Sequence, residues 1–305
     1  MKLNNANLSA LPVAVPGYDR ASLTGGIVHF GLGNFHRAHQ AVYLDRLINS
    51  GEGFNFAIIG AGVMPADARA RDVLAEQDFL YTVVEQSAEA SDPRVVGAMI
   101  DYLAPGDPAA VIAKLVDPAV KIASLTITEG GYFIDAATGH FHKTHPAVVA
   151  DGANPDARKT VFGMLVAGLK ARRDAGMQPF TVMCCDNIPH NGVVTKEAVV
   201  ETARLSDPAL ADWIAANVAF PNGMVDRIVP APTDATREAV ARLIGCEDAV
   251  PVLAEGFTMW VLEDRFAAGR PAWEHAEGVV FSDEVGKYEL VKLRLLNGSH
   301  SLIAY

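Results

Sequence analysis

Three polar side chains late in the chain have the types and spacing for acid–base chemistry. They are the amine of Lys292, the amide of Asn297 and the imidazole of His300, within segment 292–300. If this segment is a helix, Asn297 and His300 lie about 140° and 80° around its axis from Lys292, so all three can share one face. A base, a hydrogen-bond donor to a reacting oxygen and an orienting group are what oxidation of a secondary alcohol requires. The alternative is a solvated polar face on an amphipathic helix.

Polar residues also follow the predicted buried strands. Glu129 follows the apolar run 121–128, Asp186 and Asn187 follow 180–185, and Asp226 and Arg227 lie in the proline-bracketed segment 220–230. Ligands of open α/β sheets bind outside the carboxyl ends of the strands, so these side chains are candidates for one site. The alternatives are ordinary turn chemistry in the second segment and a structural ion pair in the third.

A glycine-rich turn between the first predicted strand and the first predicted helix has features of a phosphate-binding turn. Gly31 allows a tight turn, and Gly33 lets a phosphate approach the backbone beside a helix N-terminus. His36 stands where the usual third glycine would be, so an ordinary strand–turn–helix connection is the alternative. The residues expected to bind a cofactor here are Gly31, Gly33, Asn34, Phe35 and Arg37. Arg37 either pairs with phosphate or is a solvated cation of the first turn.

The second predicted strand, 56–63, ends without an acidic residue at its tip, where this kind of fold binds the ribose hydroxyls of NAD. Asp67 is the nearest carboxylate. It is either the ribose-binding acid or the N-cap or first-turn acid of the next helix. No arginine occupies the tip itself. We therefore expect NAD as the cofactor, with NADP left open.

The elements that must position these residues alternate between strands and helices. Apolar runs of strand length lie at 27–31, 56–63, 121–128 and 180–185, and helical patterns lie at 35–49, 66–77, 107–116 and 154–173. Near-continuous apolar strands alternating with helices predict a doubly wound, mainly parallel Rossmann-type sheet. Segments 80–85 and 95–102 are expected to form an antiparallel hairpin or sheet extension, and 258–266 and 278–282 late strands.

A last helix is expected to begin near Asp283. We therefore divide the chain into a dinucleotide-binding domain, 1–284, and the first helix of an incomplete helical substrate domain, 285–305. The 305 residues are enough for one large domain or two.

Composition narrows the class of function. The net charge of −11 argues against binding of nucleic acid or an anionic membrane surface. The three cysteines include no C-x-x-C pair, so neither a disulfide framework nor a structural zinc site is expected. The histidines are expected in loops or on the surface rather than as metal ligands. The chain shows no signal-peptide or membrane-span pattern, and we expect a cytoplasmic protein.

Five ordered motifs carry a resemblance to a known family. They are GLGNFHRAHQ at 31–40, LTITEGGY at 125–132, CDNIPHNG at 185–192, VDRIVP at 225–230 and KLRLLNGSH at 292–300. The sequence resembles the polyol-specific long-chain dehydrogenases, which include mannitol 2-dehydrogenase, arabinitol dehydrogenase and the fructuronate and tagaturonate reductases. The resemblance covers residues 25–305. Members of that family continue as a mostly helical second domain, so the chain is expected to be truncated.

The resemblance implies a metal-independent, NAD(P)-linked interconversion of a sugar alcohol and its ketose. It implies Lys292 as the general base, Asn187 and Asn297 as donors to the reacting oxygen, His300 as an orienting group, Glu129 as an acid involved in proton exchange, and Asp226 with Arg227 as substrate-binding residues. A lysine base is useful near neutral pH only if burial lowers its usual pKa of about 10.4.

Two alternatives stay open from the sequence. One is the sister activity on hexuronates, which would reduce fructuronate or tagaturonate. The other, of a different class, is a fragment that binds NAD but turns nothing over. The expected partners are a small polyol or ketose and at most a weak homo-oligomer, with no nucleic acid and no membrane.

Overall fold

A five-stranded parallel sheet forms the centre of the molecule in the computed structural model, which describes residues 1–87, 89–155, 157–292 and 294. Its strands, in spatial order, are β5 (Met99–Leu103), β2 (Ala57–Ala61), β1 (Gly25–Phe30), β6 (Ile122–Leu125) and β7 (Thr181–Cys184). Every pairing between neighbours is parallel. The strand order reverses direction between β1 and β6, which makes this the topological switch point. The predicted doubly wound Rossmann-type sheet is confirmed.

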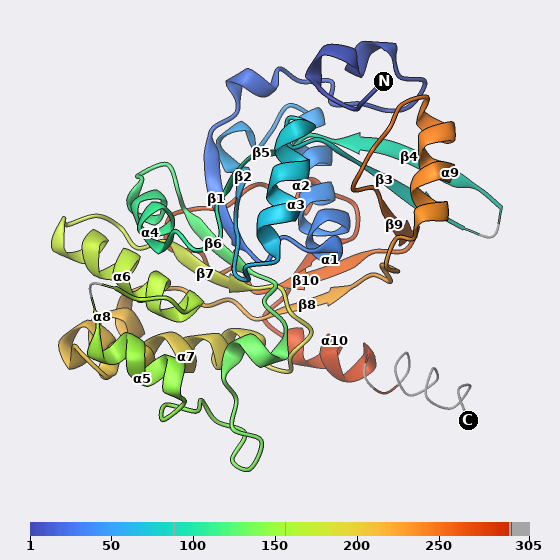
Figure 1. Ribbon diagram of the computed structural model, residues 1–305. Helices are drawn as coiled ribbons and strands as arrows, with labels where there is room; N and C mark the ends of the chain where they lie inside the picture. The colour runs from blue at the N-terminus through green and yellow to red at the C-terminus, as the bar shows by residue number, and fades with distance from the viewer. Residues whose placement is uncertain (88, 156, 293, 295–305) are drawn as a thin grey trace.

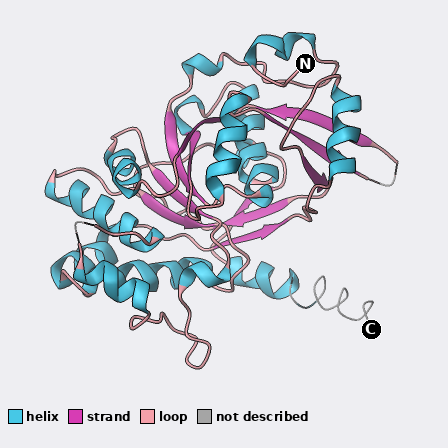
Figure 2. Ribbon diagram, in the orientation of Figure 1, coloured by secondary structure: helices cyan, strands magenta, loops and turns pink. Residues whose placement is uncertain are grey.

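Helices cover both faces of this sheet, as Figures 1 and 2 show. On one side lie α4 (Pro108–Val116), α5 (Pro146–Ala153), α6 (Val161–Asp174), α7 (Asn191–Arg204) and α8 (Pro208–Asn217). On the other side lie α1 (Asn34–Ala38), α2 (Gln40–Asn49) and α3 (Asp67–Glu76). Successive strand residues face opposite sides, so Val28 joins the hydrophobic cluster under the first helices while Ile27 joins the cluster under the second. This double burial explains the continuous apolar strands of the sequence.

Two smaller sheets extend the structure. One contains β4 (Ser91–Val96), β3 (Tyr81–Gln86) and β9 (Val252–Glu255), and α9 (Asp234–Ile244) lies beside it. The other contains β11 (Val279–Phe281), β10 (Met259–Leu262) and β8 (Gly223–Asp226). Helix α10 (Val285–Val291) contacts β8 and β10. This second small sheet brings the end of the described chain next to the strand ends of the large sheet.

Segments 80–85 and 95–102, expected as an antiparallel hairpin or sheet extension, contribute to both an antiparallel pair and the large sheet. The pairing of β3 with β4 is antiparallel, as expected, but the chain then breaks at Gly97 and enters the large sheet as β5, parallel to β2. A Cβ at Gly97 would lie 2.6 Å from Cγ of Pro16, so only glycine fits at this break. The residues 95–100 on both sides of this break are apolar without interruption, so the sequence pattern gives no sign of it.

Two predicted helices have different bounds. The helix expected at 35–49 is divided at His39, whose backbone angles of φ −118° and ψ −95° are not helical. The helix expected at 154–173 begins only at Val161, after a separate helix, α5. The sequence analysis assigned no helix to α7, α8 or α9. No helix in the described part of the chain is long and apolar enough to cross a membrane.

Candidate active site

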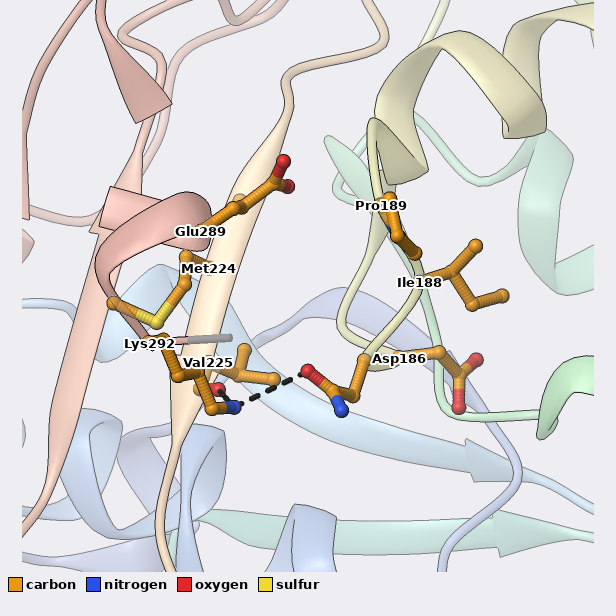
Figure 3. Close-up of a pocket in the computed structure, with 9 residues that line it drawn as sticks. Asp186, Ile188, Pro189, Met224, Val225, Glu289 and Lys292 are labelled. Carbon is orange, nitrogen blue, oxygen red and sulfur yellow. Dashed lines mark hydrogen bonds between the residues drawn. The ribbon is translucent and has the colours of Figure 1, made fainter. Parts of the chain in front are cut away.

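Lys292, directly after α10, places its amine between two elements of the sheet edge. Its Nζ donates to the carbonyl oxygen of Val225 at 2.5 Å and to Oδ1 of Asn187 at 3.1 Å. The carboxylate of Asp226 lies 3.5 Å from the same atom, and the lysine side chain is only 12% exposed. Figure 3 shows Lys292 facing the loop that carries Asp186 and Pro189 across the pocket. These three acceptors hold the amine in one place.

The side-chain amide of Asn187 has a defined orientation. An ammonium group has only donors, so the amide oxygen, and not the amide nitrogen, must face Lys292. The two N–H donors of Asn187 therefore point away from the lysine. One residue thus orients the amine and keeps donors for a second oxygen atom.

Asp186, next to Asn187, joins the loop after β7 to the loop after β6. Its carboxylate accepts hydrogen bonds from the backbone N–H of Ile127 at 2.8 Å and of Thr128 at 3.1 Å, and from the hydroxyl of Tyr132 at 2.7 Å. Burial raises the pKa of Asp186, and these bonds oppose the rise. The sequence analysis left this residue as turn chemistry or site. In the structure, the half-buried Asp186 connects the ends of two strands through these hydrogen bonds.

Two glutamates, Glu129 and Glu289, differ in their position relative to the lysine pocket. Glu129 is exposed in the short 3-10 helix Glu129–Tyr132, and no described residue bonds to its side chain. It lies close enough to Asp186 that its charge adds to the effect of burial in raising the pKa of Asp186. Glu289, which the sequence analysis did not select, lines the lysine pocket itself. Its spacing of three residues before Lys292, one helical turn, was the available signal.

Arg227 faces away from the pocket that Asp226 lines. Its side chain is fully buried, and its guanidinium donates to Oε1 of Glu85 at 2.6 Å and to the carbonyl oxygens of Ala38 and Glu255. Adjacent residues at a strand end point in opposite directions, which separates the two side chains. The structure therefore places Arg227 in a structural ion pair, the alternative of the sequence analysis, and not among the residues that line the pocket.

A second cleft lies at the switch point between β1 and β6. The turn residues Gly31 and Gly33 line it together with residues 126–128 and Asp67. Gly31 has φ +83°, and a Cβ there would lie 2.0 Å from the carbonyl oxygen of Thr126. A Cβ on Gly33 would meet only the carbonyl oxygen of Gly31 at 4.0 Å, so its backbone faces open space. The first glycine is required by the turn, and the second leaves the backbone accessible to a ligand.

Asp67 lies in the first turn of α3 and at the edge of the cleft. Its Oδ2 atom accepts from the backbone N–H groups of Val63 and Met64, each at 2.8 Å, and so closes the turn between β2 and α3. The same residue lines the cleft at the tip of β2. Because both of these bonds end on one oxygen, Oδ1 can accept from a ribose hydroxyl.

Three predicted cofactor-binding residues lie outside the lining of this cleft. Arg37 is 7% exposed and donates to Oδ1 of Asn34 at 2.6 Å and to the carbonyl oxygen of Val250. Burial lowers its pKa. Phe35 stacks on His39 at 4.9 Å between ring centroids. The prediction that Arg37 pairs with phosphate or faces solvent is therefore wrong, because its guanidinium is buried and hydrogen-bonded within the protein.

Three histidines that were expected in loops or on the surface are buried beneath the glycine turn. His29 bonds to the hydroxyls of Ser124 and Thr126, each at 2.8 Å, and stacks on His36 with ring centroids 3.4 Å apart. Burial lowers the pKa of His29 to about 3 and that of His39 to about 3, and it lowers the pKa of His36 well below its usual value. These side chains are therefore neutral near pH 7. They pack against the glycine turn in the interior of the protein.

The predicted site residues fall into three groups. Asn187 and Asp226 both lie near the Lys292 amine, which lines the pocket of Asn187 and the pocket of Asp226, and Gly31, Gly33 and Asp67 line the neighbouring cleft. Asp186 connects the two groups, since it lines the lysine pocket and binds the loop that lines the cleft. Asn297 and His300 lie outside the described residues. Among the described residues, no group of three or more His, Cys, Asp or Glu side chains is arranged to hold a metal ion.

Comparisons with known proteins identify similar chains. The family model for the mannitol dehydrogenase Rossmann domain matches residues 25–275. The chain is 56% identical to a mannitol 2-dehydrogenase of Cereibacter sphaeroides over 294 residues, which is 96% of this chain and 61% of that protein. It is 46% identical to a mannitol 2-dehydrogenase of Pyrenophora tritici-repentis, covering 100% of this chain and 55% of that protein.

Two solved structures are also similar. The chain matches Pseudomonas fluorescens mannitol 2-dehydrogenase, in a ternary complex with NAD and D-mannitol, with a TM-score of 0.94 and 50% identity. It matches D-sorbitol dehydrogenase in substrate-free form with a TM-score of 0.94 and 45% identity. Each match covers 98% of this chain and 62% of the solved chain. The chain therefore spans less than two thirds of the length of these relatives.

Proposed function

Because the chain belongs to the mannitol dehydrogenase family, we propose that it acts as an NAD-dependent oxidoreductase that interconverts a sugar alcohol and its 2-ketose, of the mannitol and fructose type. The observation that carries this proposal is the Lys292 amine, held against Asn187 and Asp226 beside the dinucleotide cleft. The relative solved with NAD and D-mannitol supports the choice of cofactor and substrate class.

The cleft at the switch point fits a dinucleotide. Gly33 exposes its backbone to the cleft, and Asp67 has a carboxylate oxygen for a ribose hydroxyl. The acid at the β2 tip favours NAD over NADP, since a carboxylate repels a 2′-phosphate. NAD, when bound, supplies the acceptor for the hydride that leaves the alcohol carbon.

Lys292 moves the proton of the reaction. In the direction of ketose reduction, its ammonium gives a proton to the carbonyl oxygen of the substrate. In the direction of alcohol oxidation, its neutral amine takes the hydroxyl proton. A positioned acid–base group of this kind contributes about 10²–10⁴ in rate. Asp226 and the carbonyl oxygen of Val225 keep the amine in place while the proton moves.

Asn187 stabilises the reacting oxygen. Its amide oxygen is occupied by Lys292, so its N–H donors can bind the oxygen that gains negative charge as the proton is lost.

Further roles are inferred from the family resemblance. We infer the same function for Asn297 and a substrate-orienting function for His300. Glu129, in the loop held by Asp186, is proposed to take part in proton exchange. We also propose that the reaction needs no metal ion, because the lysine and the amides perform both tasks that a Lewis acid would otherwise share.

The test is an absorbance assay at 340 nm with NAD or NADP against mannitol, arabinitol, sorbitol, mannonate and altronate. We expect oxidation of a polyol with NAD. Oxidation of only the hexonates would support the sister activity on hexuronates instead. NADH binding without turnover of any substrate would identify the chain as a binding fragment. The cytoplasmic location, the monomeric or weakly oligomeric state and the domain division at 284 and 285 stay predictions.

A further inference from the structure

A lysine that the sequence analysis did not select lines the dinucleotide cleft. Lys159 immediately precedes the N-cap of α6, on a different element from the glycine turn, and it lines the same cleft as Gly31, Gly33 and Asp67. The residue is exposed. Among the residues that line this cleft, it is the one with a positive charge, and Asp67 is the one with a negative charge.

The backbone at Lys159 is held rigidly. The carboxylate of Asp151, which is 3% exposed, accepts from the N–H of Lys159 at 2.7 Å and from the N–H of Thr160 at 2.9 Å. The Thr160 hydroxyl accepts from the N–H of Gly163, which caps α6. A Cβ at Gly163 would lie 2.0 Å from Oδ2 of Asp151, so glycine is required for this arrangement. The backbone of Lys159 therefore has a fixed position at the edge of the cleft.

The amine of Lys159 can contact a ligand in the cleft, whereas the guanidinium of Arg37 cannot. Within the described part of the chain, the Lys159 amine forms no ion pair and no hydrogen bond, and the residue bonds only through its backbone N–H. Arg37, the cation expected at the phosphate, is 7% exposed and bonded to Asn34. A ligand that enters the cleft can meet the first cation but not the second.

A cation in this cleft would stabilise a bound pyrophosphate. The pyrophosphate carries two negative charges, and the chain already has a net charge of −11. Helix α1, which follows the glycine turn, has only five residues, so its macrodipole is smaller than that of a longer helix. A lysine can supply the missing charge as a flexible point donor.

We propose that the Lys159 amine binds the pyrophosphate of NAD, which makes it a cofactor-binding residue and gives it the role expected of Arg37. This inference rests on the proposed function, because it needs a dinucleotide in the cleft. The loss of one charged hydrogen bond corresponds to about a 10-fold loss of affinity.

The experiment measures binding of NADH, NADPH, ADP and adenosine to the whole chain by titration calorimetry or fluorescence. ADP contains the pyrophosphate, and adenosine lacks it. For Lys159→Met we expect about 10-fold weaker binding of NADH and ADP and unchanged binding of adenosine. Lys159→Arg should retain most of the affinity. The matched control is Lys170→Met on the same helix, where Lys170 pairs with Asp174 outside the cleft, and its binding should equal that of the unmodified chain.

Each other result overturns the inference in a defined way. Equal NADH affinity in Lys159→Met and the unmodified chain would remove Lys159 from the cofactor site and leave the proposed function intact. Equal weakening of adenosine would show a structural role, which a lowered melting temperature would accompany. Weakening confined to NADPH would assign the lysine to the 2′-phosphate. Failure of the unmodified chain to bind NADH and ADP would refute this inference together with the proposed function.

Discussion

The Oδ1 atom of Asn187 lies 3.1 Å from the Nζ atom of Lys292, although 105 residues separate the two in the sequence. The amide comes from the carboxyl end of β7, and the amine comes from the end of α10. This contact orients both groups at once, since the amide oxygen receives the ammonium and the amide N–H groups are left for a substrate oxygen. The proposed chemistry depends on this pair.

Lys292→Ala should remove nearly all alcohol oxidation while NADH binding changes little. The lysine is the proposed acid–base group, and a positioned group of this kind contributes about 10²–10⁴ in rate. The measurement is kcat at 340 nm together with NADH titration. The control is Lys170→Ala on α6, where Lys170 pairs with Asp174 and lines neither the lysine pockets nor the glycine cleft. Undiminished turnover in Lys292→Ala would end the assignment.

Asn187→Ala should lower kcat by about 10²–10³, because one donor to the reacting oxygen is lost. The affinity for NADH should fall much less, since Asn187 lines the lysine pocket and not the glycine cleft. Both quantities should be measured with the fraction of folded protein. Lost stability with full activity per folded molecule would show a purely structural role.

Alanine substitutions at Gly31 and Gly33 should affect different properties, stability in the first case and NADH binding in the second. Gly31→Ala should lower the free energy of unfolding by about 1–3 kcal/mol or more, because the residue has a positive φ and its Cβ would collide with Thr126. Gly33→Ala should fold normally and weaken NADH binding, since its Cβ would enter the cleft. Denaturant unfolding and NADH titration separate the two. Unimpaired NADH binding in Gly33→Ala would contradict the cleft assignment.

Stability should fall as the pH decreases from about 6.5 towards 3. The pKa of His29 is about 3 in the folded protein, below its usual value of 6.5, so the unfolded state binds more protons in this interval. Stability is therefore fully present above pH 6.5 and is lost as the pH falls. At pH 5 the buried His29 alone would cost about 2 kcal/mol.

Denaturant unfolding of the unmodified chain and of His29→Gln at pH 7 and pH 5 measures this effect. The variant should lose less stability between the two pH values, whatever its stability at pH 7. An identical loss in both proteins would show that His29 does not contribute.

Turnover should be insensitive to chelators. The lysine and the amide donors supply proton transfer and stabilisation of charge in the proposed mechanism. The measurement is kcat before and after dialysis against EDTA, with a zinc-dependent dehydrogenase treated in parallel to show that chelation is complete. Activity that disappears with EDTA and returns with added metal would refute the metal-independent proposal.

Much of the fold follows from local patterns in the sequence. The strands of the large sheet are buried on both faces, so they appear as continuous apolar runs such as the one that becomes β1, where all six residues are buried. The break at Gly97 and the division at His39 were not predicted. In both places the chain changes direction at a point that is set by packing: Gly97 fits against Pro16, and His39 lies against Trp260.

The site was predictable where motif and position coincide, as for Lys292, Asn187, Gly31 and Gly33. It was not predictable where the direction of a long side chain decides its role. Arg37 and Arg227 are charged residues within recognisable motifs, yet each turns inward to bond backbone carbonyls. Lys159 lies in no selected motif, yet it reaches the cleft.

The sequence alone determined the fold class and the family, since both rest on the order and character of segments along the chain. Tertiary structure alone decided which charged side chains face the cleft and which form hydrogen bonds in the interior of the protein. The reason is that a side chain's environment depends on partners far away in the sequence. Arg227 donates a hydrogen bond to Glu85, 142 residues away, and Arg37 donates one to the carbonyl oxygen of Val250, 213 residues away. No local pattern contains that information.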